Sequence, residues 1–374
     1  MEMTPRERVL TALDHREPDR VPMAFGGDAS TIETDPYEEL KTHLGIDSPT
    51  VCYSRDHVAP DERIMQRIGS DIRFVRPEPV VHQPDADNSY VDQWGTRWRK
   101  STTSLYWEMA GFPLQEGTLA ELRDHQWPCF EADQFATAGE EARRLRREGT
   151  FAVAADLVCY GVFEMAWSVR GIEHFLEDLA ARPDYAGALL ERIVEVQETL
   201  FEAWLSQVGD SIDVVMVSDD VGIQSGLMIS PRTYRTMIKP FQRRLWSYIK
   251  ERTGARLFLH TCGSVYPVIG DFVELGVDIL NPIQPMAADM DTKRLKREFG
   301  DELVFWGGID TQRVLPHGSQ DDITEEVKRR LADLAPGGGY IFSPAHNVQL
   351  GVSPQNVVHL YDMGRELGRY PLSL

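Results

Sequence analysis

Residues 256–263 have the sequence Arg256-Leu257-Phe258-Leu259-His260-Thr261-Cys262-Gly263. A short apolar run ends here in side chains that can bind a metal or react, and a helical pattern follows. The same order recurs in the second half of the chain, with short β-branched or aromatic runs at 151–156, 213–218, 256–260, 278–281, 303–306 and 339–343. Strands that alternate with helices predict a parallel sheet covered by helices.

Two earlier runs, at 20–25 and 71–75, bring the number of predicted strands to eight. We therefore expect an α/β fold, a single (β/α)8 TIM barrel in which residues 1–374 form one domain. Insertions commonly lengthen this fold beyond 250 residues, so the length of the chain does not require a second core.

The first part of the chain departs from the regular alternation. Thr4, Pro5 and Glu7 predict an N-terminal helical segment, because they supply a capping box and a suitable first-turn residue. Between about 77 and 130 the pattern is irregular, and we expect an insertion there that carries a β-hairpin at 90–98.

Composition excludes several classes of function. The chain has 39 Lys and Arg against 59 Asp and Glu, a net charge of −20, which disfavours nucleic acid and anionic membrane surfaces as partners. A charged N-terminus without an apolar core predicts a cytoplasmic protein. The four cysteines have no paired spacing, so a special cysteine would be reactive or metal-bound. A homodimer is compatible with the sequence, which does not fix the oligomeric state.

Polar residues follow almost every predicted strand. In a (β/α)8 barrel the reactive face lies just beyond the carboxyl ends of the strands, so this placement is itself evidence for an active site. The residues concerned are Asp156, Asp219, Asp220, His260, Cys262, Asn281, Gln284, Gly307, Gly308, Asp310, Ser343, His346 and Asn347.

The strongest signal is His260 and Cys262, two residues apart at a strand end, because they can point the same way and bind one ion. On its own such a pair is more often a hydrogen-bonded histidine and a small buried cysteine. His346 follows another late strand and supplies a third ligand. Nitrogen and sulfur ligands predict zinc. Glu164, Asp220, water or a substrate group could complete its coordination.

The remaining candidates have weaker signals. Asp156, Asp219 and Asp220 would orient a substrate or pass a proton. Asp219 and Asp220 would bind substrate groups, share a proton or support the metal; in the alternative, one faces inward and the other forms a salt bridge outside. If the strand stays regular, the two cannot both face inward. Gly307 and Gly308 would let a substrate or cofactor approach the backbone, although glycines in loops more often only form turns. We assign substrate or cofactor contacts to Asn281, Gln284, Gly307, Gly308, Asp310 and Asn347.

Taken together, these motifs resemble the uroporphyrinogen decarboxylase superfamily over nearly the whole chain. The superfamily consists of (β/α)8 barrels with two main branches, the cofactor-free porphyrinogen decarboxylases and zinc methyltransferases that use corrinoid proteins. The matching segments are Thr4-Pro5-Arg6-Glu7-Arg8-Val9, Pro18-Asp19-Arg20-Val21-Pro22, Asp219-Asp220, Ser230-Pro231, His260-Thr261-Cys262-Gly263, Gly307-Gly308-Ile309-Asp310, Ser343-Pro344-Ala345-His346 and Pro354-Gln355-Asn356.

Within this superfamily the chain is more similar to the methyltransferases. The decarboxylases carry an arginine-rich loop after the first strand, and residues 25–30, Phe25-Gly26-Gly27-Asp28-Ala29-Ser30, contain no arginine. The resemblance implies a zinc site and a corrinoid (cobalamin) co-substrate on a partner protein, with a small methyl donor or acceptor. The thiol methyltransferases usually have cysteine as third ligand, whereas this chain has His346, which leaves the zinc more electrophilic.

Three other functions stay open at this point. In a tetrapyrrole decarboxylase, Asp219 or Asp220 would stabilise a protonated pyrrole without a metal. A non-catalytic barrel would only bind a corrinoid or porphyrin. A metal-dependent hydrolase is the weakest alternative, because it usually has several histidines and a carboxylate rather than cysteine.

Overall fold

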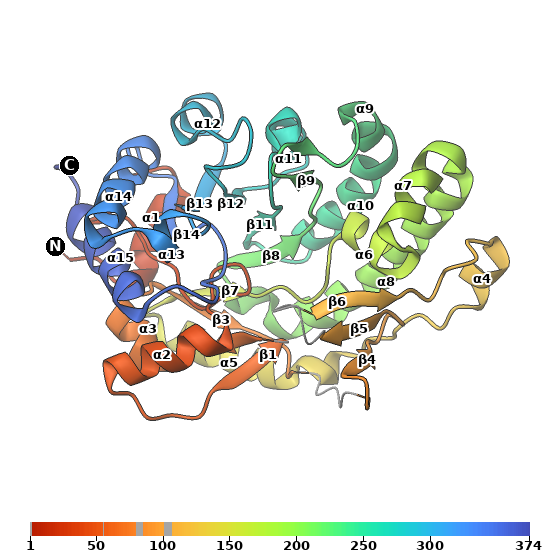
Figure 1. The fold of residues 1–374 in the computed structure, drawn as a ribbon, viewed down its shortest axis with the longest axis horizontal. Coiled ribbons are helices and arrows are strands. Elements are labelled where there is room, and N and C mark those ends of the chain that lie inside the picture. Colours follow the sequence, from red (N-terminus) through yellow and green to blue (C-terminus); the bar gives the residue numbers. More distant parts are fainter. Residues whose placement is uncertain (1, 55, 80–84, 101–106) are drawn as a thin grey trace.

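A computed structural model describes residues 2–54, 56–79, 85–100 and 107–374 of the chain. Seven parallel strands form one curled sheet, in the order β14-β13-β12-β11-β8-β7-β3, with helices around it (Figure 1). Their bounds are β3 (Ile72–Val75), β7 (Ala152–Ala155), β8 (Val214–Ser218), β11 (Arg256–His260), β12 (Ile279–Ile283), β13 (Val304–Ile309) and β14 (Tyr340–Pro344). The predicted α/β barrel class is confirmed.

The segment at 20–25 occupies the place of the eighth strand without being a regular strand. Ala24 N donates to Phe342 O of β14 at 3.0 Å, and Asp71 N, next to β3, donates to Met23 O at 2.8 Å. Because Pro22 has no N–H, this segment cannot form a complete ladder. The prediction of a regular strand at 20–25 was therefore wrong, although the segment bridges the two ends of the sheet.

Helices follow the strands as predicted, and the capping box of α1 is present, with Thr4 and Glu7 each bonded to the other's backbone N–H. The α-helices are α1 (Pro5–Leu13), α2 (Thr34–Leu44), α3 (Glu62–Ile68), α4 (Leu119–Asp124), α5 (Ala136–Glu148), α6 (Val162–Arg170), α7 (Ile172–Ala181), α8 (Pro183–Val208), α9 (Pro231–Thr233), α10 (Lys239–Lys250), α11 (Ile269–Glu274), α12 (Thr292–Phe299), α13 (Val314–His317), α14 (Gln320–Leu334) and α15 (Pro354–Leu367). Short 3-10 helices lie at η1 (Ala132–Phe135), η2 (Gly209–Ser211) and η4 (Tyr266–Val268), and η3 (Tyr234–Ile238) is a π-helix.

Two apolar cores stabilise the barrel. Apolar side chains from each strand of the sheet fill the interior, where the Trp306 and Phe258 rings meet edge-to-face with centroids 5.0 Å apart. A larger core lies between the sheet and the helices. The interior of the barrel is therefore packed with side chains, and a site has to lie at one end of it.

A buried ion network ties the N-terminal segment to β3. Asp71 is 1% exposed and accepts from Arg8 at 2.6 Å and from Arg20 at 2.8 Å. The same carboxylate accepts from the backbone N–H of Met23 at 2.8 Å. These contacts hold α1 and the segment at 20–25 against the sheet.

The irregular region contains the predicted hairpin. β4 (Ser89–Val91) pairs antiparallel with β5 (Arg97–Lys100), and β6 (Trp107–Gly111), which was not predicted, adds a third strand. Two small hairpins, β1 (Val51–Ser54) with β2 (His57–Ala59) and β9 (Gly222–Ile223) with β10 (Gly226–Leu227), complete the strands. Within the described ranges, no helix combines the length and apolar character needed to cross a membrane.

Candidate metal centre and its cavity

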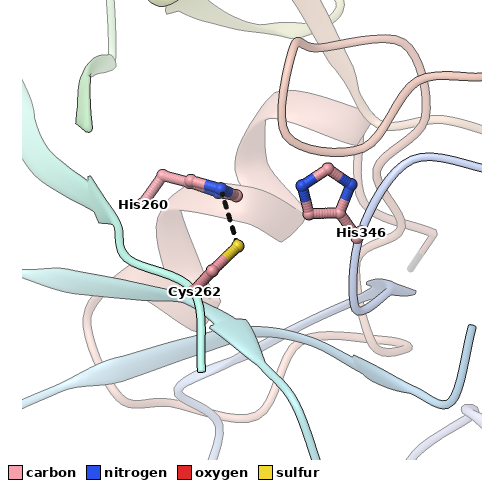
Figure 2. Close-up of side chains that lie close together, drawn as sticks. All are labelled: His260, Cys262 and His346. Atoms are coloured by element: carbon pink, nitrogen blue, oxygen red, sulfur yellow. Dashed lines mark hydrogen bonds between the residues drawn. The ribbon is translucent and has the colours of Figure 1, made fainter. Parts of the chain in front are cut away.

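The structure brings His260, Cys262 and His346 together at the carboxyl ends of β11 and β14 (Figure 2). One ligand atom from each residue lies within 4.8 Å of the other two. His260 Nε2 is 3.4 Å from Cys262 Sγ, and the two imidazole rings have centroids 5.4 Å apart. His260 is 7% exposed, and the other two side chains are half-buried, so the group is shielded but reachable.

Asn281 fixes the orientation of the His260 ring. Its Nδ2 donates to Trp306 O at 3.1 Å, which leaves Oδ1 facing His260 Nδ1 at 2.6 Å. An amide oxygen only accepts, so Nδ1 must carry the proton and the lone pair of Nε2 is directed toward Cys262. This is the tautomer that a metal-binding histidine needs.

His346 and Cys262 need adjustment before an ion binds. Burial, together with His260, lowers the pKa of His346 to about 3, so its ring is neutral. Its Nδ1 accepts from Asn347 N at 2.8 Å, and the other ring nitrogen faces the pair (Figure 2). Binding through Nε2 would require the proton to move to Nδ1 and that hydrogen bond to break. Burial, with Asp220 and Glu164 nearby, raises the pKa of Cys262, so a metal must displace its proton.

With these two changes the group offers two nitrogens and one thiolate, a donor set that fits zinc. Gln284 supports it from outside, because Oε1 accepts from Gly263 N at 2.6 Å and Nε2 approaches Cys262 Sγ at 3.9 Å. Asp220 Oδ1 accepts from Cys262 N at 2.6 Å. The backbone around the thiol is therefore held on both sides.

Glu164 is a buried acid beside this group. Ser218 Oγ donates to its Oε2 at 2.5 Å. Burial, followed by the charges of Asp220 and Asp219, raises the pKa of Glu164 well above its ordinary value. This acid lies inside the cavity that His260 lines, where burial favours its neutral form.

Asp219 is engaged in holding α6. Its Oδ1 accepts from the backbone N–H groups of Phe163 and Glu164, both at 2.9 Å, and Gln242 Nε2 donates to Oδ2 at 2.7 Å. Burial raises the pKa of Asp219 to about 6, although these donors favour the charged form. The side chain is 1% exposed and caps the helix that carries Glu164. Its position indicates support of the site rather than contact with a substrate.

Asp156 is also engaged, and it anchors a pair that the sequence did not reveal. It accepts from Arg76 Nε at 2.8 Å and from Asp28 N at 3.0 Å. The Asp28 carboxylate lies 2.8 Å from His57 Nδ1, and both side chains line the cavity. His57 holds the pKa of Asp28 below its ordinary value, against the effect of burial. The position of Asp28, directly after the run at 20–25, was the one signal available for this pair.

The other predicted contacts lie outside the described lining of the cavity. Asn347 accepts from Thr31 N at 2.9 Å through Oδ1. Asp310 Oδ1 accepts from the N–H of Gln312 at 2.7 Å and so forms a turn. The remaining positions, Gly307 and Gly308, have φ of +112° and +97°, which side chains rarely adopt, and they shape the end of β13.

A cavity of about 590 Å³ connects the metal-ligand group to the region that precedes β7. This volume is in the range of small-molecule sites. Its described lining comprises Asp28, Tyr53, Ser54, His57, Arg76, Pro77, Glu78, Pro79, Tyr90, Asp92, Gln93, Trp94, Trp98, Phe130, Gln134, Phe135, Leu157, Val158, Cys159, Tyr160, Glu164, Met165, Leu200, Ser218, Asp220, His260 and His346.

Comparisons with known proteins agree with this architecture. A methyltransferase from Methanosarcina mazei superposes with a TM-score of 0.68 at 18% identity, over 98% of this chain and 99% of that one, which shows a shared fold. The uroporphyrinogen decarboxylase of Psychromonas ingrahamii is 24% identical over 191 residues, 48% of this chain and 51% of that protein. That of Syntrophotalea carbinolica is 27% identical over 236 residues, 60% and 62% of the two chains. The chain thus spans about half the length of the first of these relatives and somewhat more of the second.

A family model described as uroporphyrinogen decarboxylase (URO-D) matches residues 119–367, which is more than half of the chain. The matched region contains the metal-ligand group and six of the seven strands of the sheet, all but β3. The chain therefore belongs to the uroporphyrinogen decarboxylase (URO-D) family.

Proposed function

We propose that this chain is a zinc-dependent methyltransferase that moves a methyl group between a small methylated substrate or thiol and a corrinoid (cobalamin) carried by a partner protein. The observation that carries the proposal is the convergence of His260, Cys262 and His346, whose ligand atoms lie within 4.8 Å of one another beside a cavity. The fold shared with the Methanosarcina mazei methyltransferase supports the choice of this branch of the family.

When bound by these three residues, zinc would lower the pKa of a thiol or hydroxyl and polarise the heteroatom that carries the methyl group. The chain's own residues would then orient the ligands and transfer protons. Asn281 holds His260 in the ligand tautomer. Glu164, whose pKa is raised by burial, is placed to donate a proton to a leaving heteroatom, and the Asp220 carboxylate is placed to accept one from an incoming thiol.

Decarboxylation of a tetrapyrrole is the second candidate, because the curated relatives carry that name. Two observations oppose it. Among the described lining residues, Arg76 is the one arginine, and Asp156 and Gly26 O already engage its guanidinium. Of the two carboxylates that could stabilise a protonated pyrrole, Asp219 instead caps α6, which leaves Asp220 alone at the cavity. The cavity thus offers little to bind the several carboxylates of such a substrate.

Metal analysis of purified protein, combined with methyl transfer from methylcobalamin to a thiol, tests the proposal. Cys262→Ser should lose both zinc and transfer, whereas Cys129→Ser, which alters an exposed cysteine, should keep both. Full transfer activity in a zinc-free Cys262→Ser protein would end the proposal. Cobalamin binding without transfer in the zinc-loaded wild type would indicate a non-catalytic corrinoid-binding barrel instead.

A further inference from the structure

We propose that the cavity binds a substrate with an uncharged, planar aromatic body, which lies against a wall of fixed rings. The ring wall consists of Trp94, Trp98, Phe130 and Tyr160, all of which line the cavity. The inference depends on the proposed function only in placing the methyl-bearing atom at His260, Cys262 and His346.

The ring wall is rigid because other aromatic rings hold its members from outside the cavity. The centroid of Trp94 lies 6.4 Å from those of Phe130 and Trp127, and Trp127 in turn meets His125 edge-to-face at 4.7 Å. Such ring contacts stabilise beyond the area that they bury. This first chain of ring contacts starts at the cavity and ends at side chains outside its described lining.

A second chain of ring contacts also runs outward from the cavity. Trp98 and Tyr160 have ring centroids 6.4 Å apart, and Tyr160 stacks on Trp167 at 6.5 Å with an interplanar angle of 28°. Trp98 is 3% exposed. Aromatic rings that are held in place before a ligand arrives favour an aromatic ligand, because ring contacts stabilise it and little side-chain entropy is lost on binding.

One carboxylate joins the two chains of ring contacts. Asp92 Oδ1 accepts from the backbone N–H of Trp94 at 2.9 Å, and its Oδ2 accepts from Trp98 Nε1 at 2.8 Å. Asp92 is therefore a positioning residue for both tryptophans. Both of these donors are uncharged groups, so the contacts add no positive charge at the cavity.

The charge of the described lining disfavours an anionic ligand. Asp28, Glu78, Asp92 and Asp220 contribute carboxylates. Arg76 is held by Asp156 at 2.8 Å, and its guanidinium lies 4.2 Å from the centroid of the Tyr53 ring. A carboxylate on the substrate would meet negative charge at the described surfaces, so the bound body is expected to be uncharged.

Three matched probes test the proposal by isothermal titration calorimetry on the full chain: anisole, methoxycyclohexane and 4-methoxybenzoate. Anisole should bind at least fivefold more tightly than methoxycyclohexane, which has the same size but no aromatic ring. It should bind at least tenfold more tightly than 4-methoxybenzoate, which adds one negative charge.

Two variants locate the binding. Val158→Trp places a bulky ring in the cavity and should weaken anisole at least tenfold, whereas Leu119→Trp, on exposed α4, should leave it unchanged. Phe130→Leu keeps an apolar side chain but removes one ring, and it should reduce the preference for anisole over methoxycyclohexane. This second variant keeps the test decisive if Val158→Trp does not fold.

Equal affinity for anisole and methoxycyclohexane, tighter binding of 4-methoxybenzoate, or unchanged binding by Phe130→Leu would each overturn the inference. The proposed function fails separately, through absence of zinc or of methyl transfer. Anisole binding with the expected preferences in a protein without transfer would support the ring wall and reject the methyltransferase.

Discussion

Replacing Asn281 with Leu should weaken zinc binding without touching a ligand atom. Asn281 is fully buried, and its amide links the Nδ1–H of His260 to the carbonyl of Trp306. Leu has the same number of side-chain heavy atoms and a similar branched shape but no acceptor. The His260 ring would lose the contact that fixes its tautomer and its angle, and a ring that donates through Nε2 cannot bind a metal.

The magnitude follows from this one contact. Outer-shell partners of metal-bound histidines typically contribute about 10- to 100-fold in metal affinity, equivalent to about 1.4–2.7 kcal/mol. The variant would also leave the His260 N–H and the Trp306 carbonyl without their partners, which costs roughly 1–3 kcal/mol of folding stability. Because typical domains have about 5–15 kcal/mol of stability, the protein should remain folded.

The assay is a competition titration of zinc against a chromophoric chelator, with circular dichroism to show that the variant is folded. Asn356→Leu is the matched control, because Asn356 Nδ2 donates to the carbonyls of Leu315 and Gly318 away from the metal-ligand group. It should lose stability but keep the wild-type zinc affinity. Wild-type zinc affinity in folded Asn281→Leu would refute the assigned role of the His260–Asn281 contact.

Three further predictions concern other parts of the structure. Arg8→Met should lower the free energy of unfolding by about 3 kcal/mol, because Asp71 stays buried with Arg20 as its remaining ion partner. A lower urea midpoint of unfolding would support this, and an unchanged midpoint would contradict it. Folding raises the pKa of Asp219 from 3.8 to about 6, so the folded state takes up a proton and stability falls as the pH rises through that window. Asp219→Asn should flatten this part of the curve of unfolding free energy against pH, and an unaltered slope would exclude the assignment. His346→Cys should retain zinc within about tenfold while His346→Ala loses it, as measured by elemental analysis, because thiolate is also a zinc ligand; equal retention by both would show that residue 346 is not a ligand.

The parallel strands could be predicted from the sequence because each is a short apolar run that ends at a polar residue and is followed by a helical pattern. Residues 257–260 are an example, since the apolar run ends at His260, a candidate metal ligand. The segment at 20–25 is also mainly apolar, but Pro22 lacks the backbone N–H that a regular strand pairing requires. Propensity alone therefore predicted a strand where the backbone forms only isolated bonds to β14 and β3.

Positions at strand ends were predictable, whereas the partners of each side chain were not. Asp156 follows β7 as expected, but its oxygens are taken by Arg76 and by the backbone of Asp28. Those partners come from loops more than 75 residues away in sequence, as Arg76 shows at a separation of 80. No local pattern encodes such contacts, and for the same reason His57 carried no signal.

Asp219 and Asp220 show how alternation along a strand divides roles between identical neighbours. Ser218 and Asp220 line the cavity, and Asp219 between them points to the N-terminus of α6. The period of two thus continues past the end of β8. Within the described residues, the Asp219 carboxylate accepts from backbone N–H groups and from the Gln242 amide, and not from the cation that the salt-bridge alternative required. By capping α6, Asp219 sets the position of Glu164. Replacing Asp219 should therefore shift Glu164 in the cavity, even though Asp219 itself does not line the cavity.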